Sequence, residues 1–185
     1  MKLIDIVLLY PNKHWDWKKL SKNPLITMID VVSHPEIPWD IAWLSNNSSI
    51  TIEDIITHPK LNWDYKYISK NKLITLQHVL DNPKCGWDMR VLSSNPSIKL
   101  KDVLANPTIN WDMKGLSMNP SITFQDVLDH PELEWRIREL SSNTSITIKD
   151  VITNPKIGWH MWELSMNPSI TIQDVFNHPE LDWHW

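Results

Sequence analysis

Hydrophobic and polar residues along this chain follow a pattern that repeats every 24 positions without insertion. Eight tryptophans mark the repeats: Trp15, Trp39, Trp63, Trp87, Trp111, Trp135, Trp159 and Trp183. When each of them is counted as position 0, position 5 is always Leu or Ile, position 6 Ser, position 8 Asn, position 11 Ile and position 20 Pro. A fixed period of this kind is typical of repeat proteins whose units pack on their neighbours.

Each repeat carries two signals for the start of a helix. Thr at position 12 precedes Asp or His at position 15 in six repeats, which is a variant of the capping box. Asp at position 1 of the first five repeats can cap an earlier helix, and Glu139 and Glu163 supply a first-turn carboxylate where Arg136 and His160 replace that Asp. Asn at position 8 and the residue before Pro at position 20 end the helices. The pattern predicts a first helix at positions 2–7 and a second helix at positions 13–18.

Helices this short are not stable in isolation, so their apolar positions must be buried between neighbouring repeats. The second helix offers positions 13, 16 and 17 as one stripe, and the first helix offers positions 2 and 5. We expect these positions, position 22 (including Cys85) and the Trp at position 0 to form the core. The predicted fold is an all-α solenoid of seven helix–turn–helix repeats.

We expect one solenoid domain over residues 1–185. Its parts are an N-terminal half-unit, seven repeats and the truncated start of a further unit, namely 1–14, 15–38, 39–62, 63–86, 87–110, 111–134, 135–158, 159–182 and 183–185. The pattern W-D-x-x-x-L-S-x-N-P-x-I-T-x-x-D-V-x-x-H-P resembles tandem Trp-rich repeats of giant DNA viruses of amoebae, over Trp15 to Trp183. The resemblance implies no particular activity, and it implies a location in the host cytoplasm or in the virion.

Composition and charge narrow the functional classes. The net charge of −4 and the pI near 6.0 lack the basic character of a typical nucleic-acid-binding domain. One cysteine excludes an intramolecular disulfide framework and fits a reducing compartment. Asp5 interrupts the apolar N-terminal stretch and Pro11 follows it, so we expect neither a signal peptide nor a membrane span. An intracellular protein is the expectation.

The repeated polar residues that could bind a metal or act in catalysis have simpler structural roles. His at position 19 in four repeats is expected to end a helix, because one His per layer cannot chelate a metal. Asp at position 15 is expected to cap, and the Ser and Asn positions are expected to bond the local backbone. With three Gly in the chain, no phosphate-binding loop is expected. We therefore expect no enzyme, no metal and no cofactor.

Two surfaces are candidate binding sites. Position 3 of the repeat lies in the first helix and is basic in all repeats except those with Ala42 and Trp162. The resulting basic row consists of Lys18, Lys66, Arg90, Lys114 and Arg138. This row could follow an acidic partner or single-stranded nucleic acid, but a solvated face with cancelled charges is favoured, and we expect the Trp positions to be core rather than base-stacking platforms.

The second surface is the last layer, which has no following repeat and consists of Val175, Phe176, Leu181, Trp183 and Trp185. We expect it to be covered in a two-fold dimer or by end-to-end stacking, unless the tail folds back over it. The leading functional interpretation is a scaffold that binds another protein. The alternatives are a self-assembling structural component and nucleic-acid binding along the basic row.

Overall fold

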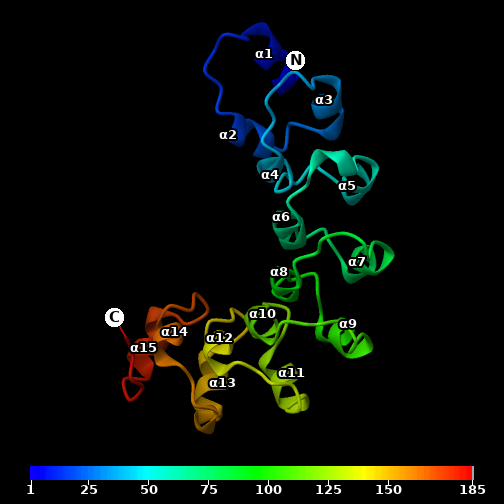
Figure 1. The fold of residues 1–185 in the computed structure, drawn as a ribbon. Coiled ribbons are helices and arrows are strands. Elements are labelled where there is room, and N and C mark those ends of the chain that lie inside the picture. The colour runs from blue at the N-terminus through cyan, green and yellow to red at the C-terminus, as the bar shows by residue number, and fades with distance from the viewer. Residues whose placement is uncertain (185) are drawn as a thin grey trace. The chain divides into compact units, whose positions relative to one another are not determined.

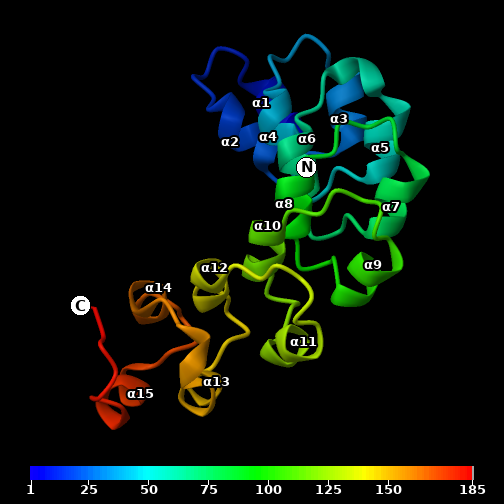
Figure 2. The same ribbon diagram turned by 60° about the horizontal axis from the view of Figure 1, so that its bottom comes forward.

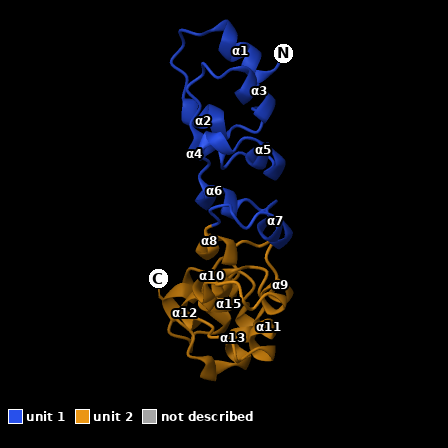
Figure 3. Cartoon of the chain, turned by 45° about the vertical axis from the view of Figure 1, so that its right-hand side comes forward, with its two compact units in different colours: residues 1–87 blue, residues 88–185 orange. Residues whose placement is uncertain are grey.

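The computed structural model describes residues 1–184 and contains two compact units, Met1–Trp87 and Asp88–Trp185 (Figure 3). The described residues form fifteen α-helices, two short 3₁₀ helices and no strand. In both units, pairs of short helices follow one another along the chain and pack on the next pair. The predicted all-α repeat solenoid is confirmed as a fold class.

The helices lie where the repeat pattern predicts them. The helices of the first unit are α1 (Leu3–Leu9), α2 (Trp17–Lys22), α3 (Met28–Ser33), α4 (Ile41–Leu44), α5 (Ile52–Thr57), η1 (Pro59–Leu61), α6 (Tyr65–Lys70) and α7 (Leu76–Asp81). Those of the second unit are α8 (Met89–Ser93), α9 (Leu100–Ala105), α10 (Met113–Met118), α11 (Phe124–Asp129), α12 (Ile137–Ser141), α13 (Ile148–Thr153), η2 (Pro155–Ile157), α14 (Met161–Ser165) and α15 (Ile172–Asn177). Every second helix spans positions 13–18 and every first helix begins at position 2, as predicted, but α4, α8, α12 and α14 end before the predicted position 7.

In each unit the first helices form one row and the second helices form another (Figure 1, Figure 2). In the first unit α2 packs on α4, and in the second unit α8, α10, α12 and α14 pack on one another in sequence. The short turns between helices carry the chain from one row to the other. This arrangement brings the same repeat position of successive repeats side by side.

The predicted caps are present. Asp112 accepts a hydrogen bond from the backbone N–H of Gly115 at 2.8 Å, and the Asp at position 1 of the four earlier repeats caps its helix in the same way. Thr123 and Asp126 form a reciprocal capping box at the start of α11, with a Thr123 N to Asp126 Oδ2 distance of 2.7 Å. The N-cap residues of α12 and α14, which are not Asp, form no side-chain cap bond.

The core is made of one layer per repeat. Position 5 of the first helix and position 16 of the second helix are buried in all seven repeats, and position 11 is buried in six. Position 13 is buried in the first five repeats. Position 22 is only half-buried in most repeats, and Cys85 is among the half-buried residues rather than in the core.

Hydrogen bonds from Asn and Ser side chains join successive repeats. Asn119 Nδ2 donates to the carbonyls of Ser93, Asn95 and Ile98 in the preceding repeat, at 2.9–3.0 Å. Asn119 Oδ1 accepts from the N–H of Ser121, which is the local bond that was predicted. The prediction missed the three bonds between repeats, which Asn47 and Asn143 also form.

The Ser at position 6 makes a second connection of this type. Ser117 Oγ donates to the carbonyl of Met113 at 2.8 Å and accepts from the N–H of Arg136 at 3.0 Å. Ser117 therefore ties the end of one first helix to the start of the next. Ser45, Ser93 and Ser141 each make the same two hydrogen bonds as Ser117 in their own repeats.

Candidate functional site

Every second helix exposes an apolar side chain at position 17. The exposed fractions lie between 40% and 72%. The members of this apolar row are Val32, Ile56 and Leu80 in the first unit and Leu104, Leu128, Ile152 and Phe176 in the second. The prediction that position 17 is buried is wrong: position 16 is the one that is buried in all seven repeats, and position 17 lies about 100° further round the helix from it.

In the first unit, a groove of about 720 Å³ lies beside the row between the first two repeats. Its walls come from α3, from the Pro-rich turn after it, and from the turn after α5. Its lining residues are Val31, Val32, Pro35, Ile37, Pro38, Trp39, Ile41, Thr57, His58, Pro59, Lys60 and Leu61. Most of these side chains are apolar, so the groove suits an apolar occupant.

In the second unit, an equivalent groove of about 390 Å³ lies between the last two full repeats. Its lining residues are Val151, Ile152, Pro155, Gly158, Trp159, Met161, Glu180 and Leu181. All eight correspond to lining residues of the first groove at a distance of five repeats. The groove is therefore built by the repeat itself, and its chemistry changes where Glu180 replaces Lys60.

The Trp at position 0 forms part of the wall of these grooves and is held by one hydrogen bond. Trp39 Nε1 donates to the carbonyl of His34 at 3.0 Å, and Trp159 Nε1 donates to the carbonyl of Asn154 at 3.0 Å. Only Trp63 is buried, whereas the other seven are half-buried. The expectation that these Trp residues are core is thus wrong for most repeats, because part of each of the seven half-buried residues reaches the surface.

A His–Glu pair flanks the Pro of the turn in three repeats. His130 Nδ1 lies 2.9 Å from Glu132 Oε1, and the hydrogen bond from His130 lowers the pKa of the Glu132 carboxyl. His34 with Glu36 and His178 with Glu180 form the same contact at 3.1 and 3.0 Å. The carbonyl of each His also accepts the Trp hydrogen bond, so the His residue fixes the turn.

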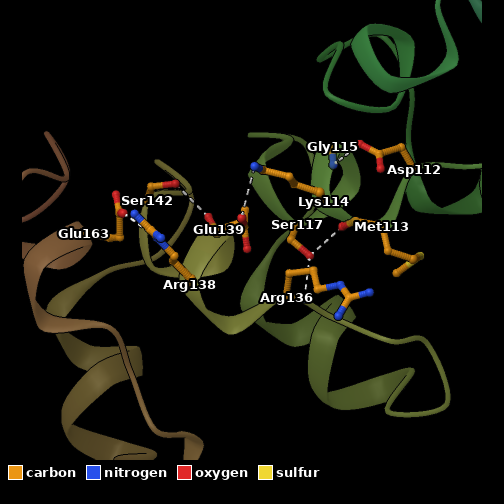
Figure 4. A network of polar contacts seen from close by, with 10 residues as sticks. All are labelled: Asp112, Met113, Lys114, Gly115, Ser117, Arg136, Arg138, Glu139, Ser142 and Glu163. Atoms are coloured by element: carbon orange, nitrogen blue, oxygen red, sulfur yellow. Dashed lines mark hydrogen bonds and ion pairs between the residues drawn. The ribbon is translucent and has the colours of Figure 1, made fainter.

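The basic row is largely ion-paired in the second unit. Lys114 Nζ lies 3.6 Å from Glu139, and Arg138 Nε donates to Glu163 Oε1 at 2.9 Å (Figure 4). Each carboxylate comes from position 4 of the following repeat. Arg90 is exposed. Within this unit, the Glu side chains reduce the positive field of the row.

The first unit differs because position 4 holds no carboxylate. Lys18 and Lys66 are exposed and form no ion pair with the residues that the structure describes. Trp43 and Tyr67 occupy position 4 here, and their rings stack with centroids 6.4 Å apart. Lys18 and Lys66 therefore lie on the same row of helices as an aromatic pair.

The residues predicted to form the last layer do not share one environment. Val175 is buried, with 9% of its surface exposed, so its place in an exposed end-face is a wrong expectation. Phe176 is 72% exposed and belongs to the apolar row. Leu181 and Trp183 are half-buried, and Trp183 Nε1 donates to the carbonyl of His178 at 2.8 Å. Trp185 lies outside the described residues.

The described residues contain neither a candidate metal-binding cluster nor a candidate membrane-spanning helix. There, no group of three or more His, Cys, Asp or Glu side chains could hold a metal ion. No helix among the described residues has both the length and the apolar character that crossing a membrane requires. Comparison of the chain with protein-family models, with curated proteins and with solved structures found no match.

Proposed function

We propose that this chain is a non-enzymatic scaffold that binds an extended segment of another protein along the apolar row of either unit. The observation that carries the proposal is that an apolar side chain is exposed at position 17 of all seven repeats. Scattered exposed apolar residues are ordinary, but a row of them in register marks an interaction surface. The resemblance to giant-virus repeats further suggests that the partner is in the infected host cell or in the virion.

The geometry of a solenoid favours an extended partner. The first helices of neighbouring repeats pack on one another, and packed helices lie about 8–10 Å apart. A polyproline II segment rises about 3.1 Å per residue with three residues per turn, so every third side chain returns to the same face after about 9 Å. Such a segment presents apolar side chains at a regular interval, as the second helices of each unit do at position 17. The Pro and Trp side chains that line the grooves are also the kind of surface on which polyproline II segments bind.

The test uses a synthetic peptide of about fifteen residues with Pro at every third position, and a scrambled peptide of the same composition. Leu128→Asp places a charge on the row, and Gln125→Asp places the same charge elsewhere on α11. Both positions are exposed, so both variants should fold. Loss of a half-buried apolar contact should weaken binding about fivefold for Leu128→Asp.

Binding of the repeating peptide by the unchanged protein and by Gln125→Asp, with weaker binding by Leu128→Asp, would support the proposal. Equal binding by the two variants, or equal binding of the scrambled peptide, would reject the row as the site. Light scattering distinguishes binding of another protein from the self-assembly alternative. Concentration-dependent growth in mass that Leu128→Asp abolishes would mean that the row binds a second copy of the chain.

A further inference from the structure

Charge is distributed unevenly between the two units. Residues 1–87 contain 10 Lys and Arg against 9 Asp and Glu, whereas residues 88–185 contain 8 against 13. In the first unit, the lysines concentrate on the first helices: Lys18, Lys19, Lys22, Lys66 and Lys70. The net charge of the whole chain therefore conceals a local basic surface.

A cavity of about 470 Å³ opens on this surface between α2 and α4. It is lined by Lys18, Lys19, Lys22, Pro24 and Trp43, together with Asp16. Asp16 is already engaged, because it accepts from the backbone N–H of Lys19 at 3.0 Å and its carboxylate lies 3.3 Å from Lys19 Nζ. Lys18 and Lys22 form no ion pair with any residue in the described ranges, so their positive charges are available to a ligand.

Trp43 makes this cavity more than a cluster of lysines. Lys22 Nζ lies over the Trp43 ring, 5.2 Å from its centroid, and Trp43 stacks on Tyr67 with an interplanar angle of 26°. The face of an aromatic ring that a cation occupies can also stack against a second flat, uncharged ring. In the second unit, the corresponding position is Val91, Gly115, Glu139 or Glu163, so it offers no aromatic ring, and the two Glu would repel an anion.

We propose that this face of the first unit binds single-stranded nucleic acid. A base stacks on Trp43 and displaces the ammonium group of Lys22, which then pairs with a neighbouring phosphate together with Lys18. Lys66, at the position equivalent to Lys18 two repeats further on, extends the path along the same row. Stacking on an aromatic ring and contacts with phosphates do not distinguish sequences, so binding is sequence-independent.

The aromatic pair favours nucleic acid over an acidic peptide. Carboxylates could pair with Lys18 and Lys22, but they would leave the face of the Trp43 ring unused. A nucleotide uses both features at once, because its base has a flat face and its phosphate carries a charge. This site lies on the row of first helices, so it is separate from the apolar row of the proposed scaffold function.

The experiment measures fluorescence anisotropy of a labelled oligo-dT of about twelve nucleotides with the full chain. Three phosphate contacts would give a slope of log affinity against log salt of about −2. The affinity should therefore fall about 20-fold between roughly 50 and 200 mM salt. Trp43→Leu should weaken binding about 10-fold with little change in the slope, since stacking is lost and the charges remain.

The paired variant Lys18→Gln with Lys22→Gln should weaken binding and also flatten the slope by about 1.4. The matched control is Lys114→Gln with Arg138→Gln, which removes two cations from the ion-paired part of the row and should leave affinity within about twofold. Circular dichroism confirms that each variant is folded. Peptide binding by Trp43→Leu should be unchanged, which separates this test from that of the scaffold function.

Absence of oligo-dT binding at low salt would overturn the proposal. So would equal losses in the two lysine variants, because binding would then follow total charge rather than this site. A poly-Glu peptide provides the last arm. If it binds as tightly as oligo-dT and Trp43→Leu affects neither ligand, the surface recognises acidic proteins and the nucleic-acid assignment is wrong.

Discussion

Asn119 Nδ2 donates a hydrogen bond to the main-chain carbonyl of Asn95, its equivalent one repeat earlier, over 2.9 Å. The same amide group also serves the carbonyls of Ser93 and Ile98, so its two N–H groups are shared among three acceptors. Asn119 is fully buried. A buried polar side chain of this kind is stabilising only because all its partners are present.

The first prediction concerns this amide. Asn119→Ala should lower the free energy of unfolding by about 3 kcal/mol, because three buried carbonyls lose their donor. Asn23→Ala is the matched control, since Asn23 is half-buried and its Oδ1 accepts from the N–H of Leu25 at 2.9 Å. It should cost about 1 kcal/mol. Urea unfolding of both variants checks the difference, and similar losses would contradict the role of the inter-repeat bonds.

The second prediction concerns the start of α14. His160 is the N-cap residue, but its side chain forms no cap bond, and its buried Nδ1 has no hydrogen-bond partner among the described residues. His160→Asp should raise the free energy of unfolding by about 1 kcal/mol, because Asp can accept from the free N–H groups of the first turn. Asp does so at the same position in five other repeats. A drop in melting temperature for His160→Asp would show that the ring's packing outweighs the missing cap.

The third prediction concerns Gly115 in α10. A Cβ atom there would lie 2.7 Å from the carbonyl oxygen of Arg90 and 2.9 Å from Ser93 Cβ, so α10 and α8 would have to separate. Gly115→Ala should lower the free energy of unfolding by about 2 kcal/mol, although Ala favours helix formation by about 1 kcal/mol. Gly86→Ala is the control, because its Cβ would meet Tyr65 Cδ2 at an ordinary 3.5 Å. Calorimetry that ranks Gly86→Ala as the more harmful change would refute the close approach.

The fourth prediction concerns pH. Burial, and then the hydrogen bond that Tyr65 Oη donates to Cys85 Sγ at 3.2 Å, raise the pKa of Tyr65 to about 12. The neutral form is therefore favoured in the folded state, so its contribution to stability is complete below pH 10 and is lost as pH rises towards 12. Absorbance at the phenolate band should show one tyrosine titrating near pH 12, and Tyr65→Phe should remove it. A Tyr65 transition at pH 10 would contradict the burial and the bond.

Much of the fold could be predicted because the same local rule recurs in each repeat. Caps and helix breakers act over three or four residues, so the start of every first helix and both ends of every second helix can be located from the sequence alone. The burial of Leu116 and Val127 follows from those helix boundaries, since each residue lies on the inner face of a short helix. The sequence pattern predicted these features correctly because they depend on neighbours along the chain.

The binding surfaces were harder to predict because they depend on how many apolar side chains one layer can hold. Leu128 and Val127 are adjacent and equally apolar, yet only Val127 is buried. The hydrophobic pattern cannot separate them until the width of the layer is known. Likewise, the stacked pair of Trp43 and Tyr67 joins residues 24 positions apart, and only the packing of the repeats brings the two rings together.

The hydrogen bonds between Asn119 and the preceding repeat also explain why the length of the repeat does not vary. They connect residues 21, 24 and 26 positions apart, so inserting a single residue within a repeat would misalign them at its junctions with both neighbours. Duplicating or deleting a whole repeat would preserve them, since each unit supplies donors to the unit before it and acceptors to the unit after it. Such a chain can change in length by whole repeats at little energetic cost, but it cannot change by single residues.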